Sequence, residues 1–508
     1  MTIHLSIVLF LPLASGVIGA LLPRGMARWA VLAGTVAVLA SAIVLLVDFD
    51  AASGGLQYVT NDKWIPELGV RYQLGIDGLN LFMVALTAVA WVPCTLVAGF
   101  REPDRPKLFF FNMALAETAV LGAFMAQDLA LFIVFFDLML VPFYFLIGGW
   151  GTGDRVRATT KFVIYTLAGS LLMLAGAVAL GVLATPDGGT ISFSIVTLQH
   201  RSLSVGSQEW IVLLFAAAFF VKAPLFPLHG WVPETYRSTT IPVLALLSGV
   251  LSKVGVYGFL RIVLPVMPAG AQHWQELFII IAVFSVLYGS VLAFSQDNVR
   301  LVVAYSSIAQ LGFIVLGIFS FDEKGAQGAV FQMLNHGLVV VPLFLIIGVV
   351  AARARGSESL KELGGIAFRA PVLATLFLLT TFATLAMPGS ANFVGELLVL
   401  FGFYEDKLVY GLIASVGVVL AAVYMIRVFQ RTMHNPPGRA VASQEVGRID
   451  LAALAPLVAV IVVLGLYPNF VVTRTEETTV RKIAAARAVQ SAKQQAAADQ
   501  PAQEVVHR

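Results

Sequence analysis

The chain has 508 residues, of which 59% are hydrophobic and 12% charged, and its mean hydropathy is +0.88. Soluble domains are nearer half apolar and a quarter charged, so this composition excludes an ordinary soluble globular protein. The net charge of +3 gives no nucleic-acid footprint. The single cysteine, Cys94, cannot by itself build a disulfide, a Cys-ligated iron–sulfur cluster or a Cys-based zinc site. Neither GxGxxG nor GxxxxGK[ST] occurs, so no nucleotide-binding motif is visible. The sequence predicts an all-α polytopic membrane protein.

Apolar runs close to the ~20 residues that a helix needs to cross a bilayer recur along the chain. They predict 14 membrane helices, at about 3–22, 27–47, 77–99, 108–126, 128–149, 158–184, 207–226, 240–263, 272–294, 297–318, 327–352, 370–403, 408–430 and 450–471. The first run has no basic residue before it and no small-residue cleavage site, so we interpret it as a retained helix.

These helices and the polar segments between them divide the chain into five parts. Residues 1–107 hold helices 1–3 and the polar loop 48–76, where the alternating VRYQLGI stretch predicts a hairpin. Residues 108–263 and 272–430 are predicted to form two five-helix units. Residues 431–471 hold helix 14 and the loop before it. Residues 472–508 form an Ala/Gln/Lys-rich tail, expected to be partly helical or disordered.

The distribution of basic residues predicts the orientation in the membrane. The odd-numbered loops carry 18 of the 32 Lys and Arg residues, against six in the even-numbered loops and six in the tail. The positive-inside rule therefore predicts cytoplasmic odd loops and both termini outside. This count leaves two cations, Lys222 and Lys253, inside apolar helices.

Ionisable residues inside predicted membrane helices are the main functional signal, because each costs a few kcal/mol in lipid and usually faces a partner or water. A structural role in holding helices together is the alternative for any one of them. By contrast, Asp77, Asp128 and Asp297 stand at helix starts and are predicted to be helix caps. The intramembrane candidates are Glu117, Asp137, Lys222, Lys253, His336 and Glu396.

Two of the candidates lie on a predicted hairpin of helices 4 and 5. Glu117 and Asp137 are each ~15 Å from the turn at 1.5 Å per residue, so both carboxylates lie near the middle of the membrane. Whether they face each other is left open by the sequence.

Two predicted helices are interrupted next to ionisable residues. Lys222 precedes Ala-Pro-Leu-Phe-Pro in helix 7, and Glu396 follows Met387-Pro388-Gly389-Ser390 in helix 12. Proline removes a backbone donor, and broken helices in lipid typically line a cavity or an ion site. A harmless kink is the alternative for either break alone.

A recurring spacing predicts an internal repeat. Asp137 and Lys222 are 85 residues apart, and Gln310 and Glu396 are 86 apart. Helices 4–8 and 9–13 are therefore predicted to be two five-helix repeats. Because five is odd, the second copy must be inverted, an arrangement common in transporters.

The motifs along residues 70–430 resemble a known family. They are LGIDGLNLF, FFDLMLVPFYFLIGGWG, TTKFVIYTLAGS, FFVKAPLFPLHGWVPE, SKVGVYGFLR, VAYSSIAQLGF, FQMLNHGL and LAMPGSANFVGELLVLFG. Together they resemble the antiporter-like M-subunit family of bacterial NADH:quinone oxidoreductase, respiratory complex I, whose mitochondrial counterpart is subunit four.

The resemblance implies a proton path along a midplane row of charges. Matched by motif, the row comprises Asp137, Lys222, Lys253, His336 and Glu396. It also implies that this chain holds no cofactor or metal, and that partner subunits carry NADH, FMN, iron–sulfur clusters and quinone. The implied partners are the L and N antiporter-like paralogues, small membrane subunits and the lipid of a bacterial cytoplasmic membrane.

Two departures from the family pattern concern the row itself. Asp137 stands where the family usually has Glu, so its pairing with Lys222 needs closer helices or a bridging water, unless Glu117 supplies the reach as an auxiliary acid. Gln310 stands where the family often has His; glutamine can order water but cannot carry a proton charge.

The mechanism expected from these residues is electrostatic. An ionised Asp137 stabilises Lys222 as a cation, and loss of that charge favours release of its proton. The proton then passes by water through Lys253 and His336 to Glu396. The alternatives are a subunit of a multisubunit sodium/proton antiporter, a subunit of a related membrane-bound dehydrogenase or hydrogenase, and a scaffold without transport.

Overall fold

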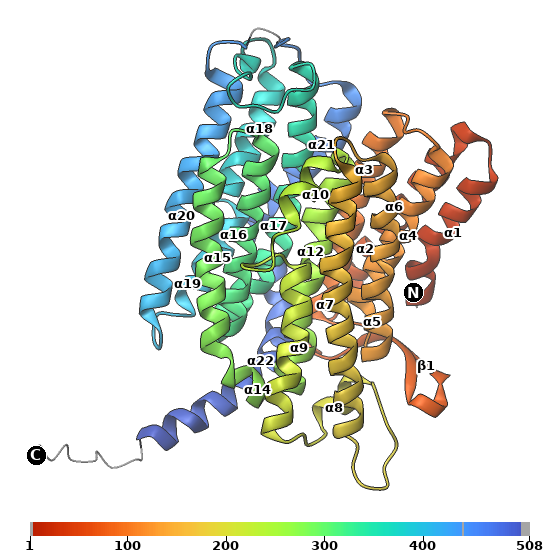
Figure 1. Ribbon diagram of the computed structural model, residues 1–508, viewed down its shortest axis with the longest axis vertical. Helices are drawn as coiled ribbons and strands as arrows, with labels where there is room; N and C mark the ends of the chain where they lie inside the picture. The colour runs from red at the N-terminus through yellow and green to blue at the C-terminus, as the bar shows by residue number, and fades with distance from the viewer. Residues whose placement is uncertain (1–3, 439–440, 499–508) are drawn as a thin grey trace, which may run out of the picture.

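The computed structural model describes residues 4–438 and 441–498 and is dominated by long helices that stand side by side (Figure 1). The first half of the bundle contains α1 Leu5–Leu21, α2 Ala27–Asp48, α3 Gly78–Phe100, α4 Pro106–Met125, α5 Leu129–Leu138, α6 Leu140–Trp150, α7 Arg155–Leu183, α8 Ile195–Gln199, α9 Val205–Lys222, α10 Val232–Ser238, α11 Ile241–Leu246, α12 Ser252–Gly258, α13 Leu264–Val266 and α14 Pro268–His273.

The second half continues with long helices and ends in a helix that crosses one end of the bundle. It contains α15 Gln275–Ser295, α16 Val299–Phe319, α17 Glu323–Arg353, α18 Pro371–Thr384, α19 Ala391–Phe401, α20 Leu408–Phe429, α21 Arg448–Leu466 and α22 Asn469–Ala498. Short 3₁₀ segments are η1 Arg24–Met26, η2 Pro66–Leu68 and η5 Ile366–Arg369, and π-helical segments are η3 Leu247–Leu251, η4 Phe259–Val263 and η6 Gln430–His434.

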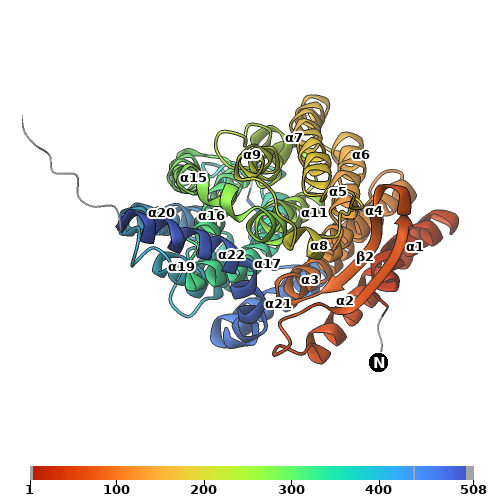
Figure 2. The same ribbon diagram turned by 90° about the horizontal axis from the view of Figure 1, so that it is seen from below.

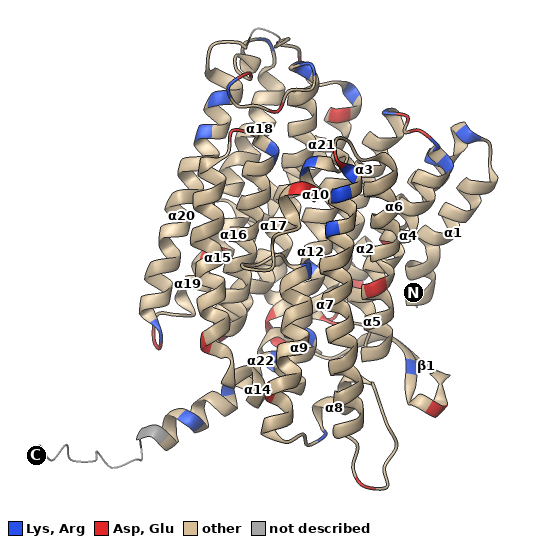
Figure 3. Cartoon of the chain, viewed as in Figure 1, with Lys and Arg blue, Asp and Glu red and all other residues tan. Residues whose placement is uncertain are grey.

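The helices have the length and composition of membrane spans. Within the described residues, 12 helices are long and apolar enough to cross a bilayer. The shorter α1 and the α18–α19 pair account for the two further predicted crossings. Figure 3 shows most charged residues toward the two ends of the bundle. The chain is a polytopic membrane protein, as predicted.

Both predicted helix interruptions are confirmed. Helix α9 ends at Lys222, and α10 begins at Val232 after nine intervening residues that include Pro224 and Pro227. Helix α18 ends at Thr384, and α19 begins at Ala391 beyond Pro388. Proline at these points removes backbone donors, so a regular helix cannot run through either segment.

Two predicted regular helices prove to be irregular. The fifth helix changes from α5 to α6 at Met139, where Pro142 has no N–H to donate to the carbonyl of Leu138 four residues earlier. The eighth helix, Ile241–Val266, contains the π-helical segments η3 and η4 on either side of α12. Apolar periodicity carries no signal for a π segment, which adds one residue to a turn.

The hairpin and the C-terminal helix lie at the same end of the bundle (Figure 2). The predicted hairpin is β1 Gln57–Ile65 paired antiparallel with β2 Val70–Ile76. The tail is helical over its described part: α22 has 30 residues and buries Thr475, Thr479 and Ile483. The predicted helix 450–471 ends earlier, at Leu466, because Pro468 follows.

A buried ion pair ties the start of α3 to the eighth helix. Arg261 is 0% exposed and donates through Nη1 and Nη2 to the two oxygens of Asp77 at 2.6 and 2.7 Å. Its Nε donates to the hydroxyl of Tyr257 at 2.7 Å. Arg261 is therefore a third cation inside an apolar helix, which the charge count above did not include beside Lys222 and Lys253.

The predicted helix caps are confirmed at two of three positions. Asp77 accepts from the N–H groups of Leu79 and Asn80, and Asp128 accepts from those of Ala130 and Leu131. The prediction for Asp297 is wrong. Asn298 caps α16, and Asp297 instead pairs with Lys361 and Arg427. These cations hold the pKa of Asp297 below its usual value.

We expect Asp77→Asn to destabilise the assembled protein by about 3–5 kcal/mol, because it leaves Arg261 as an uncompensated buried charge. Thermal inactivation of the membrane-embedded complex measures the loss. The control is Glu102→Gln, which breaks the exposed Arg28–Glu102 pair and should change stability by less than ~1 kcal/mol. Equal effects of the two variants would contradict a special role of the buried pair.

Candidate functional site

Lys222 lies buried at the end of α9 and faces α5. Its Nζ donates to the backbone carbonyl of Phe136 at 3.3 Å and lies 4.5 Å from the centre of the Phe136 ring. A cation over an aromatic face gains electrostatic attraction, more so when it is desolvated. These two contacts thus favour the charged form of Lys222, next to the residue that follows Phe136 in the chain.

That residue is Asp137, whose charge acts on Lys222. Within the described residues the two side chains form no ion pair at 4.0 Å or less. Asp137 Oδ1 is buried without a hydrogen-bond partner, and the carboxyl lies against Ser170 of α7. The pair is close enough to interact and far enough apart for an intervening water, which fits the shorter reach of aspartate.

Glu117 is not brought to Lys222. It is 0% exposed on α4, and neither of its carboxyl oxygens has a hydrogen-bond partner in the described part of the chain. The predicted similarity in depth with Asp137 thus does not produce a contact. Glu117 is a second buried acid of the first half rather than a replacement ligand for Lys222.

Lys253 is 0% exposed and held by backbone and hydroxyl oxygens rather than by a carboxylate. Its Nζ donates to the carbonyl of Ser248 at 2.8 Å and to Oγ of Ser252 at 3.3 Å. Ser248 lies in the π segment η3, five residues before Lys253. A π segment shifts the backbone pairing from i−4 to i−5. The irregular helix therefore supplies the backbone carbonyl that binds the amine of this lysine.

Close glycine contacts place Lys253 between the two halves. A Cβ on Gly255 would lie 2.6 Å from the carbonyl oxygen of Phe219 and 3.0 Å from the N of Ala223, next to Lys222. A Cβ on Gly337, beside His336, would lie 2.7 Å from the carbonyl oxygen of Gly249. Only glycine permits such backbone approach. These contacts bring α9, the eighth helix and α17 together around Lys253.

His336 is buried at 2% exposure on α17, and both its ring nitrogens lack a hydrogen-bond partner in the described chain. Lys253 is the charged residue that acts on it. A packing histidine normally satisfies at least one nitrogen, because an unpaired buried polar group costs about 1–3 kcal/mol. The observed environment therefore fits a histidine that bonds to water.

Glu396 is joined to α17 by two glutamine amides. Gln310 Nε2 donates to Glu396 Oε1 at 2.8 Å, and Gln332 Nε2 donates to Gln310 Oε1 at 2.6 Å. Gln310 is thus a direct partner of the acid. Gln332 was not predicted. Its signal in the sequence is its place one helical turn before His336, on the same face of one helix.

Serine hydroxyls connect Lys253 with this second group. Ser248 Oγ lies 3.2 Å from Oγ of Ser307 on α16, and Ser307 stands one turn before Gln310. A hydroxyl pair thus links the residue that holds Lys253 to the helix that carries Gln310.

Unsatisfied buried polar atoms gather around the break between α18 and α19. Asn335 Nδ2 donates to the carbonyl of Ala391 at the start of α19. The buried atoms of this region without a partner are Gln332 Oε1, Asn335 Oδ1, both His336 ring nitrogens, Thr381 Oγ1, both Asn392 amide atoms and Glu396 Oε2. Such a density of unpaired groups fits internal water, which usually makes about three hydrogen bonds.

The arrangement can relay protons, and it offers little to a metal ion. No group of three or more His, Cys, Asp or Glu residues within residues 4–438 and 441–498 could hold one. The row combines ionisable groups on α5, α9, α12, α17 and α19 with hydroxyls and amides between them.

The comparisons with known proteins show the family. Residues 126–421 match the family described as NADH:quinone oxidoreductase/Mrp antiporter, TM. The chain belongs to this family. Proteins named NADH-quinone oxidoreductase subunit M are similar along nearly their whole length. The protein of Rhodobacter capsulatus is 35% identical, with 92% of this chain and 94% of the relative covered. That of Mycobacterium tuberculosis is 37% identical, with 92% and 91% covered.

Solved structures share the fold. A chain of respiratory complex I from Thermus thermophilus superimposes with a TM-score of 0.87 at 29% identity, over 96% of this chain and 99% of that one. A chain of the Mrp complex from Dietzia sp. superimposes with a TM-score of 0.83 at 22% identity, over 97% and 99%. At that identity, the second likeness concerns the fold alone.

We expect Gln310→Leu to remove the donor to Glu396 and shift the infrared carbonyl stretch of the Glu396 carboxyl group, because one hydrogen bond worth about 1–3 kcal/mol is lost in a buried site. The band is assigned by its absence in Glu396→Gln. Ser320→Ala on α16's C-terminal side, whose hydroxyl donates to Gly317, is the control and should leave the band in place. An unshifted band in Gln310→Leu would show that the amide does not hold the acid.

Proposed function

We propose that this chain is the antiporter-like proton-translocating membrane subunit of a bacterial NADH:quinone oxidoreductase. The observation that carries the proposal is the set of buried ionisable groups on facing helices from Lys222 to Glu396, in a chain whose relatives are named as that enzyme's subunit M. Charged groups at this depth are costly and are typical of proton relays.

In the first half, Asp137 controls the charge of Lys222. An opposite charge favours the ionised amine, and burial disfavours it. When Asp137 is ionised, Lys222 keeps its proton. When Asp137 takes up a proton or loses its influence, the desolvated amine releases its own. The absence of a direct ion pair in the described residues supports this role, because a tightly bonded pair would hold the proton in place.

The proton then crosses to the second half through Lys253. Among the described residues this lysine binds neutral oxygens alone, from Ser248 and Ser252, so no carboxylate there fixes its charge. From there His336 can take up a proton on either ring nitrogen, and Glu396 can release it beyond the α18–α19 break. Water fills the gaps between these groups, since an amide or a serine hydroxyl orders water without carrying net charge.

The driving reaction belongs to partner subunits. NADH, FMN, iron–sulfur clusters and quinone are assigned to them, because this chain has a single, buried cysteine and no nucleotide motif. The L and N antiporter-like paralogues and small membrane subunits are the proposed neighbours, in a bacterial cytoplasmic membrane. The charge distribution of the loops supports a cytoplasmic position for the odd-numbered loops, with both termini outside.

The two halves are proposed to be inverted repeats. The breaks after α9 and after α18, with Lys222 and Glu396 beside them, support the relation, as does the near-equal spacing of 85 and 86 residues. In this arrangement each half opens toward a different side of the membrane, and Lys253 joins them.

We expect Lys222→Ala to assemble and to lose most proton pumping, because the cation that answers Asp137 is gone. Pumping and quinone reduction are measured together in the reconstituted complex, per assembled complex. The matched control is Lys161→Ala, which removes a partly exposed lysine of α7 that pairs with Glu234 of α10. Normal pumping by the Lys222 variant would contradict the proposed function.

We expect Asp137→Glu to be tolerated, because one more methylene shortens the gap to Lys222, and Asp137→Asn to impair pumping severely. Glu117 makes no contact with Lys222, so the effects of Asp137→Asn and Glu117→Gln should be independent. The pumping rate that the double variant retains should then be no lower than the product of the fractions retained by the two single variants. A strongly synergistic loss would show instead that Glu117 substitutes for Asp137.

A further inference from the structure

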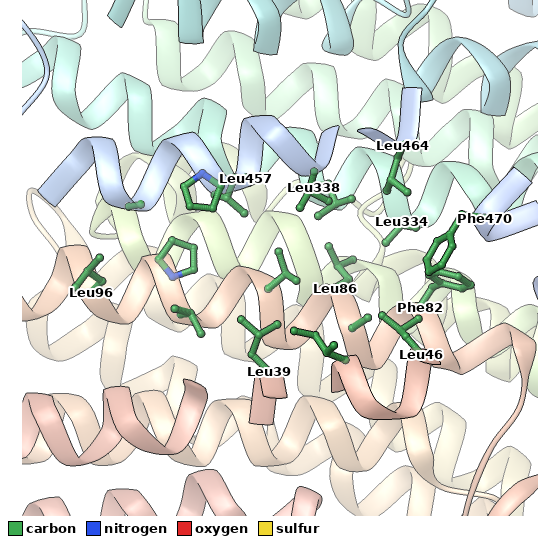
Figure 4. Close-up of a pocket in the computed structure, with 18 of the residues that line it drawn as sticks. Leu39, Leu46, Phe82, Leu86, Leu96, Leu334, Leu338, Leu457, Leu464 and Phe470 are labelled. Carbon is green, nitrogen blue, oxygen red and sulfur yellow. The ribbon is translucent and has the colours of Figure 1, made fainter. Parts of the chain in front are cut away.

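An apolar groove runs along the side of the bundle, outside the row of polar groups. It has a volume of about 360 Å³ and is lined by residues of α2, α3, α17, α21 and the start of α22. Figure 4 shows the side chains of these helices turned toward one another across it. Its size is within the range of small-molecule sites, ~300–1,000 Å³.

The groove faces lipid. In the most apolar stretch of two lining helices, α2 and α21, only 33% of the residues are buried within the chain. The corresponding stretch of α17 is fully buried and forms the floor of the groove. Ile43 on the α2 rim is 52% exposed. At this depth the surrounding medium is hydrocarbon, so a free groove is filled by an apolar chain from the bilayer.

One end of the groove carries a cation, Arg474. Phe470, which lines that end, is covered by the guanidinium of Arg474 at 4.2 Å from the ring centre. Arg474 Nη1 donates to the carbonyl of Phe470, and its Nε is buried without a partner. No acidic side chain pairs with Arg474 in the described part of the chain.

The position of Arg474 matches the level of lipid headgroups. It stands on α22, which follows the end of α21 and crosses the end of the bundle where the polar hairpin also lies (Figure 2). Asp48, the acid at the nearby end of α2, is already bonded to the hydroxyl of Tyr58. Arginine binds phosphate through paired donors in a planar fork.

We propose that the groove binds one phospholipid of the outer leaflet, with an acyl chain between α3 and α21 and its phosphate on Arg474. The bound chain contacts Leu334 and Leu338 on α17, each two positions from His336 in the sequence. The lipid therefore seals the helix that carries the central histidine from the side of the bilayer. This site is separate from the proton row, so its failure would leave the proposed function standing.

The test uses the intact complex in lipid nanodiscs and two photoreactive probes. One is phosphatidylglycerol with a diazirine on an acyl chain, and the other is diacylglycerol with the same labelled chain. After illumination, labelled residues are mapped by mass spectrometry. With phosphatidylglycerol we expect label on the groove residues Leu39, Leu334 and Phe470.

Two pairs of variants separate the acyl chain from the headgroup. Val460→Trp fills the groove from α21 and should reduce groove labelling about tenfold, whereas Val463→Trp, on the 59% exposed face of the same helix, should not. Val89→Trp fills it from α3 and provides a second filling variant. Arg474→Gln should reduce labelling by phosphatidylglycerol roughly fivefold and leave diacylglycerol unchanged, while Arg481→Gln on α22 should have no effect.

Four outcomes would overturn the proposal. The first is an absence of groove label in the unmodified complex, which would mean that a neighbouring subunit covers this face, and the second is labelling that survives both filling variants. The third is displacement of the label by excess unlabelled quinone, which would assign the groove to an isoprenoid tail. The fourth is equal loss of both probes in Arg474→Gln, which would mean that Arg474 does not bind the phosphate.

Discussion

The hydrocarbon interior of a bilayer offers no water, and this constraint sorts the buried polar groups of the protein into two kinds. Arg261 and Asp77 satisfy one another with two short hydrogen bonds, and Tyr257 completes the set. Lys253, His336 and Glu117 have no such counter-charge among the described residues. A fully paired group has no reason to exchange its proton, so the first set is structural. The second set is costly in a static protein and becomes reasonable in one that moves protons through internal water.

Irregular backbone brings the unpaired groups into one row. The π segment η3 turns the Ser248 carbonyl toward Lys253, and glycines at 249, 255 and 337 let three helices approach around that lysine. The break after α9 ends the helix at Lys222, and the break before α19 places Glu396 beside Gln310. Regular helices with larger residues at the glycine positions would keep the same charges farther apart, so the fold is specialised at the points where it departs from ideal geometry.

Most of the fold could be predicted from the sequence because lipid imposes a simple rule of about 20 apolar residues per crossing. The two helix breaks followed from proline, and the hairpin followed from alternation. The helix caps at Asp77 and Asp128 were also predictable, because a carboxylate just before an apolar run has one obvious local use.

What could not be predicted depends on three-dimensional neighbours. Arg261 was not counted among the intramembrane cations, because a buried arginine is recognisable only when Asp77, 184 residues away, is seen beside it. Gln332 has no charge, and its place one helical turn before His336 was too weak a signal to predict that it completes the chain to Glu396. Equal depth of Glu117 and Asp137 did not imply contact, because the angle of each side chain around its helix depends on packing.

The two halves of the row differ in the groups that surround their acids. In the first half a charge on Asp137 acts directly on Lys222. In the second half, neutral amides are aligned in one direction: Gln332 donates to Gln310, and Gln310 donates to Glu396 Oε1. A proton on Glu396 Oε2, which has no partner in the described residues, leaves this alignment intact. A proton on Oε1 would need an acceptor there, and the amide would have to turn, which would set its NH₂ group against that of Gln332. The hydrogen-bond inventory of glutamine thus favours protonation at the open oxygen. That oxygen has no partner among the described residues, so the amide pair directs the proton to the side of the carboxyl group that faces away from Gln310.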